Sequence, residues 1–374
     1  MRVAFIPTYV SGVVFYRVWQ PYQKLEKLFK KDKFVVTWYT PDQFTMHPWE
    51  WDLQDGQKNG ILYQHIDAAC RWADVVVWMG LHTHASLDIF VHMRAKHGKP
   101  FASEFDDYIF SIPRHNPAWG AYHPGTGFTR IALRQIKESD ALICSTPYLA
   151  DLYRPFNARV HVVENTIDVD LWEKAVPGDK TTTIGWMGGG THNEDHEMMQ
   201  DAVLEVLEKC PNSRFHYISG GPPPGAYRHP RISWDHDFKA IDKYPRWMSR
   251  KGFDIGIAPL VDNEFNRGKS NLRWLEYSAM GIPTVASPVV HFQRSIRHGE
   301  TGFLARSRAE WVDLLMKLVR EPELRENIGG AARREGKRLW NPEIQARKYR
   351  AALEVIANAK PNPRHADYAC QPAY

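Results

Sequence analysis

Residues 184–192 read IGWMGGGTH, a glycine-rich turn between an apolar, strand-like run and a helix-like stretch that begins with acidic residues. Glycine at such a turn lets backbone N–H groups come close to a phosphate, and a helix N-terminus adds the positive end of its dipole. The run has neither the GxGxxG spacing of a dinucleotide-binding turn nor the Lys-Ser/Thr ending of a Walker A loop. It therefore predicts either a phosphate-binding turn of another kind or a simple tight turn.

Short apolar runs alternate with amphipathic stretches on both sides of this turn. In the first half we expect strands at 3–6, 34–39, 74–79, 101–104, 141–144 and 160–163, and helices at 17–29, 61–72, 87–97 and 130–138. In the second half we expect strands at 182–186, 214–219, 254–258 and 283–286, and helices at 195–209, 272–280, 308–319 and 342–356. Unbroken apolar strands alternating with helices are typical of parallel sheets covered on both faces. The sequence therefore predicts an α/β protein with two doubly wound, Rossmann-like domains that face a central cleft.

The domain boundaries follow from where this alternation is interrupted. Polar residues with Pro177 and Gly178 break the pattern across residues 165–180. We expect an N-terminal domain over 1–166, a C-terminal domain over 167–340, and a helix and tail over 341–374 that pack back toward the N-terminal domain. The segment after Lys360 shows no periodicity, so we expect it to lie on the surface or to fray.

Composition limits the classes of protein that the chain can belong to. Of its 374 residues 43% are hydrophobic and 24% are charged, which suits a packed globular core and argues against general disorder. No apolar run approaches the ~18 residues of a membrane span, so we expect a cytoplasmic protein, in the host cytoplasm if a phage encodes it. The four cysteines lie far apart and predict no zinc or disulfide framework. The net charge of +5 tolerates an anionic partner without requiring one.

A second motif runs from residue 266 to residue 277, NRGKSNLRWLEY. It contains Gly-Lys-Ser, but Asn263 stands where a Walker A loop has its first glycine. Lys269 and Ser270 would stand at a helix start, where a diphosphate could meet an ammonium group, a hydroxyl and backbone amides. Glu276 follows nearly two helical turns later and could accept hydrogen bonds from ribose hydroxyls. A solvated, charged helix face is the alternative interpretation.

The region from about 182 to 305 resembles the nucleotide-sugar-binding domain of GT-B glycosyltransferases, in particular the large family called glycosyl transferases group 1. The segments that carry the resemblance are IGWMGGGTH, DIGIAPL, NRGKSNLRWLEYSAMGIPTVAS and HGETGFLA. The resemblance implies that Lys269 contacts the donor diphosphate and that Glu276 holds the ribose. It also implies that Gly188, Gly189, Gly190 and Thr191 lie beneath the phosphates.

One position departs from the family pattern. The family often has two glutamates eight positions apart, and the position eight before Glu276 is Gly268. The first acid is missing unless Glu264 replaces it from a shifted loop. The usual arginine of the phosphate site is also absent near Gly188, although His192, Arg267 or Arg273 could supply charge.

The first half adds candidates of its own. The segment YVSGVVFYR, residues 9–17, resembles the N-terminal glycine loop of the same enzymes, or it is a plain strand–helix turn. We expect the donor to contact Gly12, Arg17, Gly188, Gly189, Gly190, Thr191, His192, Lys269, Ser270, Asn271 and Glu276.

Asp106 and Asp107 follow a buried-type strand and resemble an acidic pair of a phage-rich branch of the family. One of them would orient or deprotonate an acceptor hydroxyl. Helix capping and a metal clamp are the alternatives, and GT-B enzymes usually act without a metal. His82 and His84 fit ordinary loop residues or contacts with the donor sugar. The aromatic segment 111–128 fits a loop that lines the cleft.

These features predict a glycosyltransferase that moves a sugar, a hexose by expectation, from UDP-sugar or GDP-sugar to a hydroxyl. Asp106, Asp107 and Lys269 are the expected catalytic residues, and no metal or tightly bound cofactor is expected. The acceptor is a glycan or a hydroxymethylated base in phage DNA, and a mildly basic chain suits either. The alternatives are a binding module that has lost catalysis, which the missing acid at Gly268 suggests, and a GT-B sugar-nucleotide epimerase.

Overall fold

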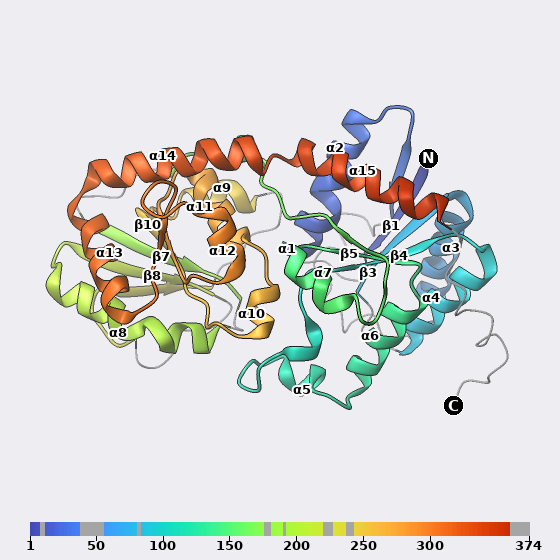
Figure 1. Cartoon of the computed structure of the whole chain (residues 1–374), viewed down its shortest axis with the longest axis horizontal. Helices are drawn as coiled ribbons and strands as arrows, with labels where there is room; N and C mark the ends of the chain where they lie inside the picture. Colours follow the sequence, from blue (N-terminus) through green and yellow to red (C-terminus); the bar gives the residue numbers. More distant parts are fainter. Residues whose placement is uncertain are drawn as a thin grey trace. The chain divides into compact units, whose positions relative to one another are not determined.

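The computed structural model describes residues 1–7, 12–37, 56–80, 84–175, 181–189, 192–219, 227–236 and 243–359. It divides the chain into two compact units, each built around a six-stranded sheet (Figure 1). The first unit comprises residues 1–110, 121–164 and the chain from Pro342 onward, and the second comprises 111–120 and 165–341.

The sheet of the first unit has the strand order β2-β1-β3-β4-β5-β6, and its strands pair in parallel. The strands are β1 (Arg2–Pro7), β2 (Lys33–Val36), β3 (Val75–Met79), β4 (Phe101–Phe105), β5 (Ala141–Cys144) and β6 (Val160–Val162). Every residue of β3 and β4 is buried, because helices cover both faces of the sheet. The strand order reverses between β1 and β3, and ligands bind at the carboxyl ends of strands beside such a reversal.

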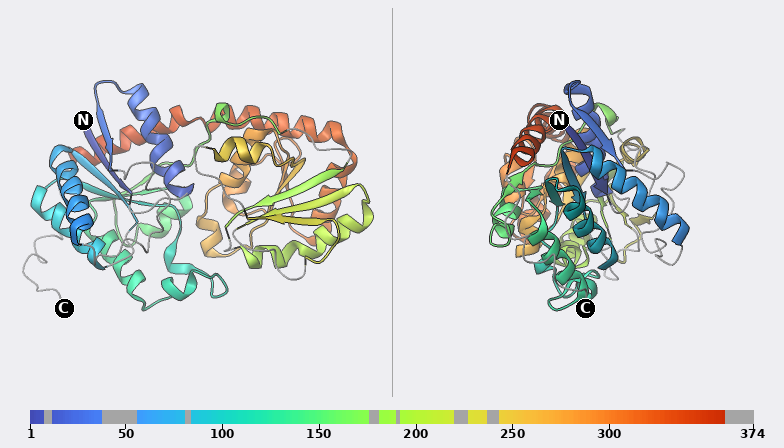
Figure 2. Two further views of the ribbon diagram at one scale, coloured as in Figure 1. Left: turned by 180° about the vertical axis from the view of Figure 1, so that it is seen from behind. Right: turned by 90° about the vertical axis from the view of Figure 1, so that its right-hand side faces the viewer.

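The helices of the first unit begin directly after β1. They are α1 (Gly12–Val14), the π-helical η1 (Phe15–Trp19), α2 (Gln20–Leu28), α3 (Gly56–Trp72), α4 (His84–His97), η4 (Ile109–Ser111), α5 (Trp119–Tyr122), α6 (Gly127–Glu138), α7 (Pro147–Tyr153) and α15 (Pro342–Asn358). Thr126 caps α6 and Thr146 caps α7, each accepting a hydrogen bond from the third residue on. The C-terminal helix α15 lies alongside α2 (Figures 1 and 2). It contributes Ala346, Tyr349, Leu353 and Ile356 to the core beneath β1 and β3.

The second unit repeats the design with the strand order β12-β11-β10-β7-β8-β9, again all parallel. Its strands are β7 (Thr182–Met187), β8 (Ser213–Ile218), β9 (Ile232–Asp235), β10 (Ile255–Ala258), β11 (Thr284–Ala286) and β12 (Phe303–Leu304). Its helices are η5 (Val169–Leu171), α8 (Asn193–Lys209), α9 (Tyr244–Ser249), α10 (Glu264–Gly268), α11 (Leu272–Met280), α12 (Val290–Ser295), α13 (Arg308–Arg320) and α14 (Pro322–Leu339). The order reverses between β7 and β10, so the glycine turn after β7 stands at the reversal.

The expected class of two Rossmann-like, parallel α/β domains is therefore confirmed. All ten expected strands are present, and the strand expected at 34–39 ends earlier, at Val36. The additions to the expected set are the strands β9 and β12 and the helices α1, η4, α5, α7, η5, α9, α10, α12 and α14. Most of these are short, whereas α14 has 18 residues and a largely polar sequence that hides its apolar face.

Candidate functional site

The turn after β7 lies at the carboxyl edge of the second sheet. Gly188 is sterically required, because a Cβ there would lie 2.4 Å from the ring of Trp186. Its N–H donates to the carbonyl of Ile218 at 3.0 Å, so this amide extends the sheet rather than facing a phosphate. Gly189 is exposed at the end of the strand. Gly190 and Thr191 lie outside the described residues, and their expected contacts with the phosphates stay predictions.

His192 and Asp195 connect this turn to the loop after β10. The ring Nδ1 of His192 lies 2.7 Å from Asp195 Oδ2, while Asp195 Oδ1 accepts from the Val261 N–H at 2.7 Å and from Asn266 Nδ2 at 3.2 Å. Burial lowers the pKa of His192 against the opposing effect of Asp195, and the charge of Lys269 lowers it further. The ring is therefore neutral at pH 7, with Nδ1–H donating to Asp195 and Nε2 left as an acceptor.

Lys269 stands at the junction between α10 and α11, in extended backbone that directly follows α10. Its ammonium lies 4.5 Å from the ring centroid of Phe265, and its charge acts on both His192 and His291. The cation is half-buried, which strengthens its field compared with a fully hydrated lysine. The structure thus brings Lys269 and His192 together from two different loops.

Ser270 and Asn271 follow Lys269 and are used in packing. The Ser270 hydroxyl accepts from Asn165 Nδ2 at 2.8 Å. Asn271 is buried, and its Nδ2 donates to the hydroxyl of Ser295 at 2.7 Å, which ties α11 to α12. Both side chains therefore already take part in hydrogen bonds within the second unit. Their expected contacts with the donor stay a prediction.

Glu276 is buried on α11 with a defined pair of donors. Its Oε2 accepts from Arg273 Nη1 at 2.6 Å, and its Oε1 accepts from the Tyr244 hydroxyl at 3.2 Å. Burial first, and then the charge of Glu276, raises the pKa of Tyr244, so the phenol keeps its proton and donates. Tyr244, which lies near the start of α9, was not among the expected site residues because no motif surrounds it.

His291 at the start of α12 is a second residue that motif analysis missed. It is 3% exposed, and the backbone of Arg267 and the charge of Lys269 both act on its ring. Burial, followed by the nearby charge of Lys269, lowers its pKa to about 3. The ring is therefore neutral at pH 7 and lies near Lys269, and only the fold, which brings the two residues together, reveals it.

Asp106 and Asp107 lie half-buried directly after β4 in the first unit. Their backbone carbonyls accept from the Ser145 hydroxyl at 3.1 Å and from the Tyr153 hydroxyl at 2.8 Å, which fixes the segment. Burial raises the pKa of Tyr122, and the charges of both aspartates raise it further. Both carboxylates therefore lie close to Tyr122 at the carboxyl edge of the first sheet, and their catalytic role stays a prediction.

Arg17 lies inside the first unit rather than on a surface. It is 2% exposed; its Nε donates to Glu104 Oε1 at 2.8 Å, its Nη2 pairs with the same oxygen, and its Nη1 donates to the Val163 carbonyl at 2.6 Å. The Tyr349 hydroxyl donates to Glu104 Oε2 at 2.7 Å. The guanidinium is thus committed to the core, and this geometry does not support the expected contact of Arg17 with the donor.

The structure gives little support to a functional role for Gly12 and the two loop histidines, His82 and His84. A Cβ at Gly12 would meet no atom within 4 Å, so sterics do not demand a glycine there. His84 is exposed at the start of α4, and His82 lies outside the described residues. Within the described ranges, no three His, Cys, Asp or Glu side chains gather as metal ligands would. Nor is any helix in these ranges long and apolar enough to cross a bilayer.

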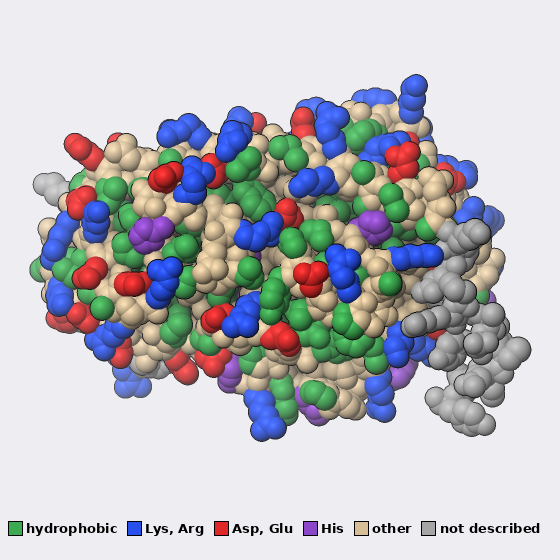
Figure 3. Space-filling view, in the orientation of Figure 1, with side chains coloured by type: hydrophobic (Ala, Val, Ile, Leu, Met, Phe, Trp, Pro, Cys, Tyr) green, Lys and Arg blue, Asp and Glu red, His purple; other side chains and the backbone are tan. Residues whose placement is uncertain are grey.

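Basic and acidic side chains are interspersed over the face of the molecule in Figure 3, without a large area of one sign among the residues drawn in colour. Interspersed charge gives a weak long-range field, whereas proteins that bind nucleic acid through its backbone gather lysine and arginine into a stripe. This face therefore gives no support to a duplex DNA acceptor.

Comparison with known proteins shows which domains the second half of the chain is similar to. Residues 181–321 match the family model described as glycosyl transferases group 1. The Bacillus subtilis protein TuaH, assigned as a teichuronic acid biosynthesis glycosyltransferase, is 26% identical over 175 residues, which are 41% of this chain and 42% of that protein. The chain thus spans less than half the length of this curated relative.

Two solved structures show the same fold over nearly the whole chain. Anabaena HepE in complex with UDP and glucose covers 95% of this chain and 99% of its own, with a TM-score of 0.63 and 12% identity. The sucrose-phosphate synthase of Thermosynechococcus elongatus covers 96% and 100%, with a TM-score of 0.64 and 12% identity. The two Rossmann-like units are therefore those of the GT-B fold.

Proposed function

We propose that this chain is a glycosyltransferase that uses a nucleoside diphosphate sugar, and UDP-sugar in particular. The observation that supports it most is the position of Lys269, His192 and Glu276 at the carboxyl edge of the second sheet, beside its strand-order reversal. The family model matches this same half of the chain, and the structural relative HepE was solved with UDP and glucose.

The leaving group of such a reaction is a nucleoside diphosphate, which gains negative charge as the bond to the sugar breaks. A half-buried ammonium at Lys269 would stabilise that charge, and the neutral Nε2 of His192 would accept a hydrogen bond from a donor hydroxyl. Glu276, held by Arg273 and Tyr244, would accept hydrogen bonds from the ribose hydroxyls. These groups supply binding and charge stabilisation without needing the acid that is missing at Gly268.

For the acceptor we propose a hydroxyl of a glycan, with a hexose as the transferred sugar. Asp106 or Asp107 would take the proton of the attacking hydroxyl, since both carboxylates lie half-buried at the carboxyl edge of the first sheet. The name of the relative TuaH supports an acceptor in cell-surface glycan synthesis. A hydroxymethylated DNA base remains a second acceptor to be assayed, although the interspersed surface charge of Figure 3 does not favour it.

The experiment is an assay of nucleoside diphosphate release with a panel of UDP- and GDP-sugars, followed by mass spectrometry of glycan and DNA acceptors. We expect Lys269→Met to lower kcat/KM by about 100-fold to 1,000-fold, the usual effect of removing one donor that stabilises the leaving group. Lys137→Met, which removes an exposed lysine of α6, is the matched control and should keep full activity.

Two outcomes would contradict the proposal. Undiminished turnover in Lys269→Met would remove the phosphate-binding role of the lysine. A donor that binds and is never consumed with any acceptor would instead indicate a binding module, and conversion of the donor to its epimer without transfer would indicate an epimerase.

A further inference from the structure

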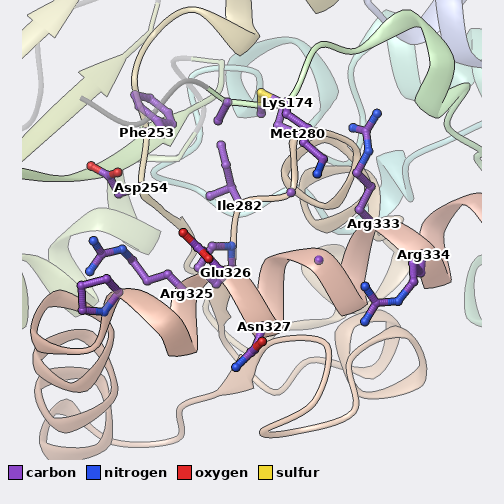
Figure 4. Close-up of a pocket in the computed structure, with 15 residues that line it drawn as sticks. Lys174, Phe253, Asp254, Met280, Ile282, Arg325, Glu326, Asn327, Arg333 and Arg334 are labelled. Atoms are coloured by element: carbon purple, nitrogen blue, oxygen red, sulfur yellow. The ribbon is translucent and has the colours of Figure 1, made fainter. Parts of the chain in front are cut away.

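A cavity of about 710 Å³ opens at the opposite edge of the second sheet, beside the amino ends of β10 and β11 (Figure 4). Asp254 and Pro283, which immediately precede these two strands, contribute to its wall. Because the strands are parallel, this edge is the reverse of the one that carries Lys269 and His192. The cavity is therefore distinct from the candidate donor site, and its volume suits a small organic ligand.

Three basic side chains occupy one side of this cavity. Figure 4 shows Lys174, Arg333 and Arg334 there, with Asp254, Glu326 and Arg325 toward the other side. The Nη1 of Arg325 already donates to two backbone carbonyls, those of Leu318 and Val319. Lys174 and Arg334 are exposed, and neither makes a hydrogen bond or ion pair with a residue that the structure describes. Among the residues that the structure describes, these two cations thus have no hydrogen-bond or ion-pair partner.

The guanidinium of Arg333 is held through its Nη2, while its Nη1 has no hydrogen-bond partner among the described residues. Its Nη2 lies 3.4 Å from the Val169 carbonyl and 3.3 Å from the Trp172 carbonyl, which holds the group near Lys174. Its Nη1 is buried and has no hydrogen-bond partner among the described residues. A buried arginine donor without an acceptor is costly, and an anionic oxygen is the acceptor that suits it best.

Two glycines keep this side of the cavity open. A Cβ at Gly281 would meet no atom within 4 Å, and a Cβ at Gly330 would meet only Arg334 Nη1, at 3.4 Å. At the end of α11 the Tyr277 and Ser278 carbonyls already accept from the N–H groups of Ile282 and Gly281. At Gly281 and Gly330 the wall of the cavity is therefore bare backbone, and no side chain fills the space beside it.

We propose that this cavity binds a small phosphorylated metabolite, with its phosphate monoester held by Lys174, Arg333 and Arg334. A phosphate offers several acceptor oxygens, which suits one arginine fork and two further cations. The acidic side chains Asp254 and Glu326 lie toward the other side and would accept hydrogen bonds from hydroxyls on the organic part. The site is independent of the proposed transfer reaction, because none of these residues belongs to the donor site.

The test is calorimetric titration of the full chain with glucose 6-phosphate and, separately, with inorganic phosphate. We expect glucose 6-phosphate to bind and the double variant Lys174→Gln/Arg334→Gln to weaken it by at least about tenfold, since each loses a charge-assisted contact. Both side chains are exposed and make no hydrogen bond or ion pair with a described residue, so this variant should fold normally. Arg130→Gln/Lys137→Gln, which removes two exposed cations of α6, is the charge-matched control and should bind like the parent chain.

A third variant separates this cavity from the donor site. Glucose 6-phosphate should bind Lys269→Met as tightly as it binds the parent chain, whether or not that variant has lost transferase activity. Binding that Lys269→Met abolishes, and that Lys174→Gln/Arg334→Gln leaves intact, would assign the phosphate to the donor site and overturn the proposal. Absence of binding by both probes, or equal weakening in the charge-matched control, would overturn it as well.

Discussion

Arg17 and Glu104 form the most deeply buried ion pair among the described residues of the first unit, with Arg17 2% and Glu104 1% exposed. Removing one partner of a buried pair leaves an uncompensated charge and costs about 3–5 kcal/mol. We expect Arg17→Met to destabilise the first unit by that amount, and Arg17→Met/Glu104→Leu to recover much of it. Thermal and urea unfolding of the three chains measures both values.

Activity of the same variants decides what Arg17 does. If Arg17 acts only within the core, the double variant regains transfer together with stability. A stable double variant without activity would restore the contact with the donor that the sequence predicted. The burial of Arg17 in an ion pair cannot be predicted from the sequence, because Arg17 and Glu104 are 87 positions apart and only the fold brings them together.

The close packing of α14 on α11 depends on glycines of α14, and Gly329 is placed more tightly than Gly336. A Cβ at Gly329 would lie 1.9 Å from the Gly281 carbonyl oxygen, which is backbone and cannot turn away. Gly329→Ala should therefore push α14 off α11 and destabilise the second unit by several kcal/mol, at or above the roughly 1–3 kcal/mol of ordinary overpacking. The melting temperature of the second unit is the measurement.

Gly330→Ala is the matched control on the next residue of the same helix. Its Cβ would meet only the flexible end of Arg334, and alanine is favoured over glycine within a helix by about 1 kcal/mol. This variant should be neutral or slightly more stable. Equal destabilisation by both substitutions would show that general helix disruption, rather than the contact with Gly281, explains the loss.

Elements with an apolar period could be predicted from the sequence, whereas elements fixed by tertiary packing could not. The buried runs of β3 and β5 and the amphipathic α6 follow directly from their residues. By contrast, α14 has a polar composition, and its close approach to the end of α11 is possible because Gly329 has no side chain. The candidate site divides in the same way, since motifs predicted Lys269 and Glu276 while Tyr244 and His291 reach them only through the fold.

At the scale of the whole molecule, two buried histidines should make the second unit sensitive to acid. Burial lowers the pKa of both His196 and His291 to about 3, and both belong to that unit. An unfolded histidine has a pKa of about 6.5, so below that pH the unfolded chain binds protons that the folded unit does not. The stability is therefore complete above about pH 6.5, and each group removes up to about 1.4 kcal/mol per pH unit as the pH falls toward 3.

His291→Phe isolates one of these two contributions. A phenyl ring fills the same buried space, and the lost contact with the Arg267 backbone changes the stability of the variant by the same amount at each pH at which the folded imidazole is neutral. Between pH 6.5 and 4.5 we expect the variant to lose less stability than the parent chain, by up to about 2.7 kcal/mol over the two units of pH. Urea unfolding of the second unit at several pH values measures the difference. A parallel pH profile in the two chains would show that His291 already takes up its proton in the folded state, and that the acid sensitivity of the second unit arises elsewhere.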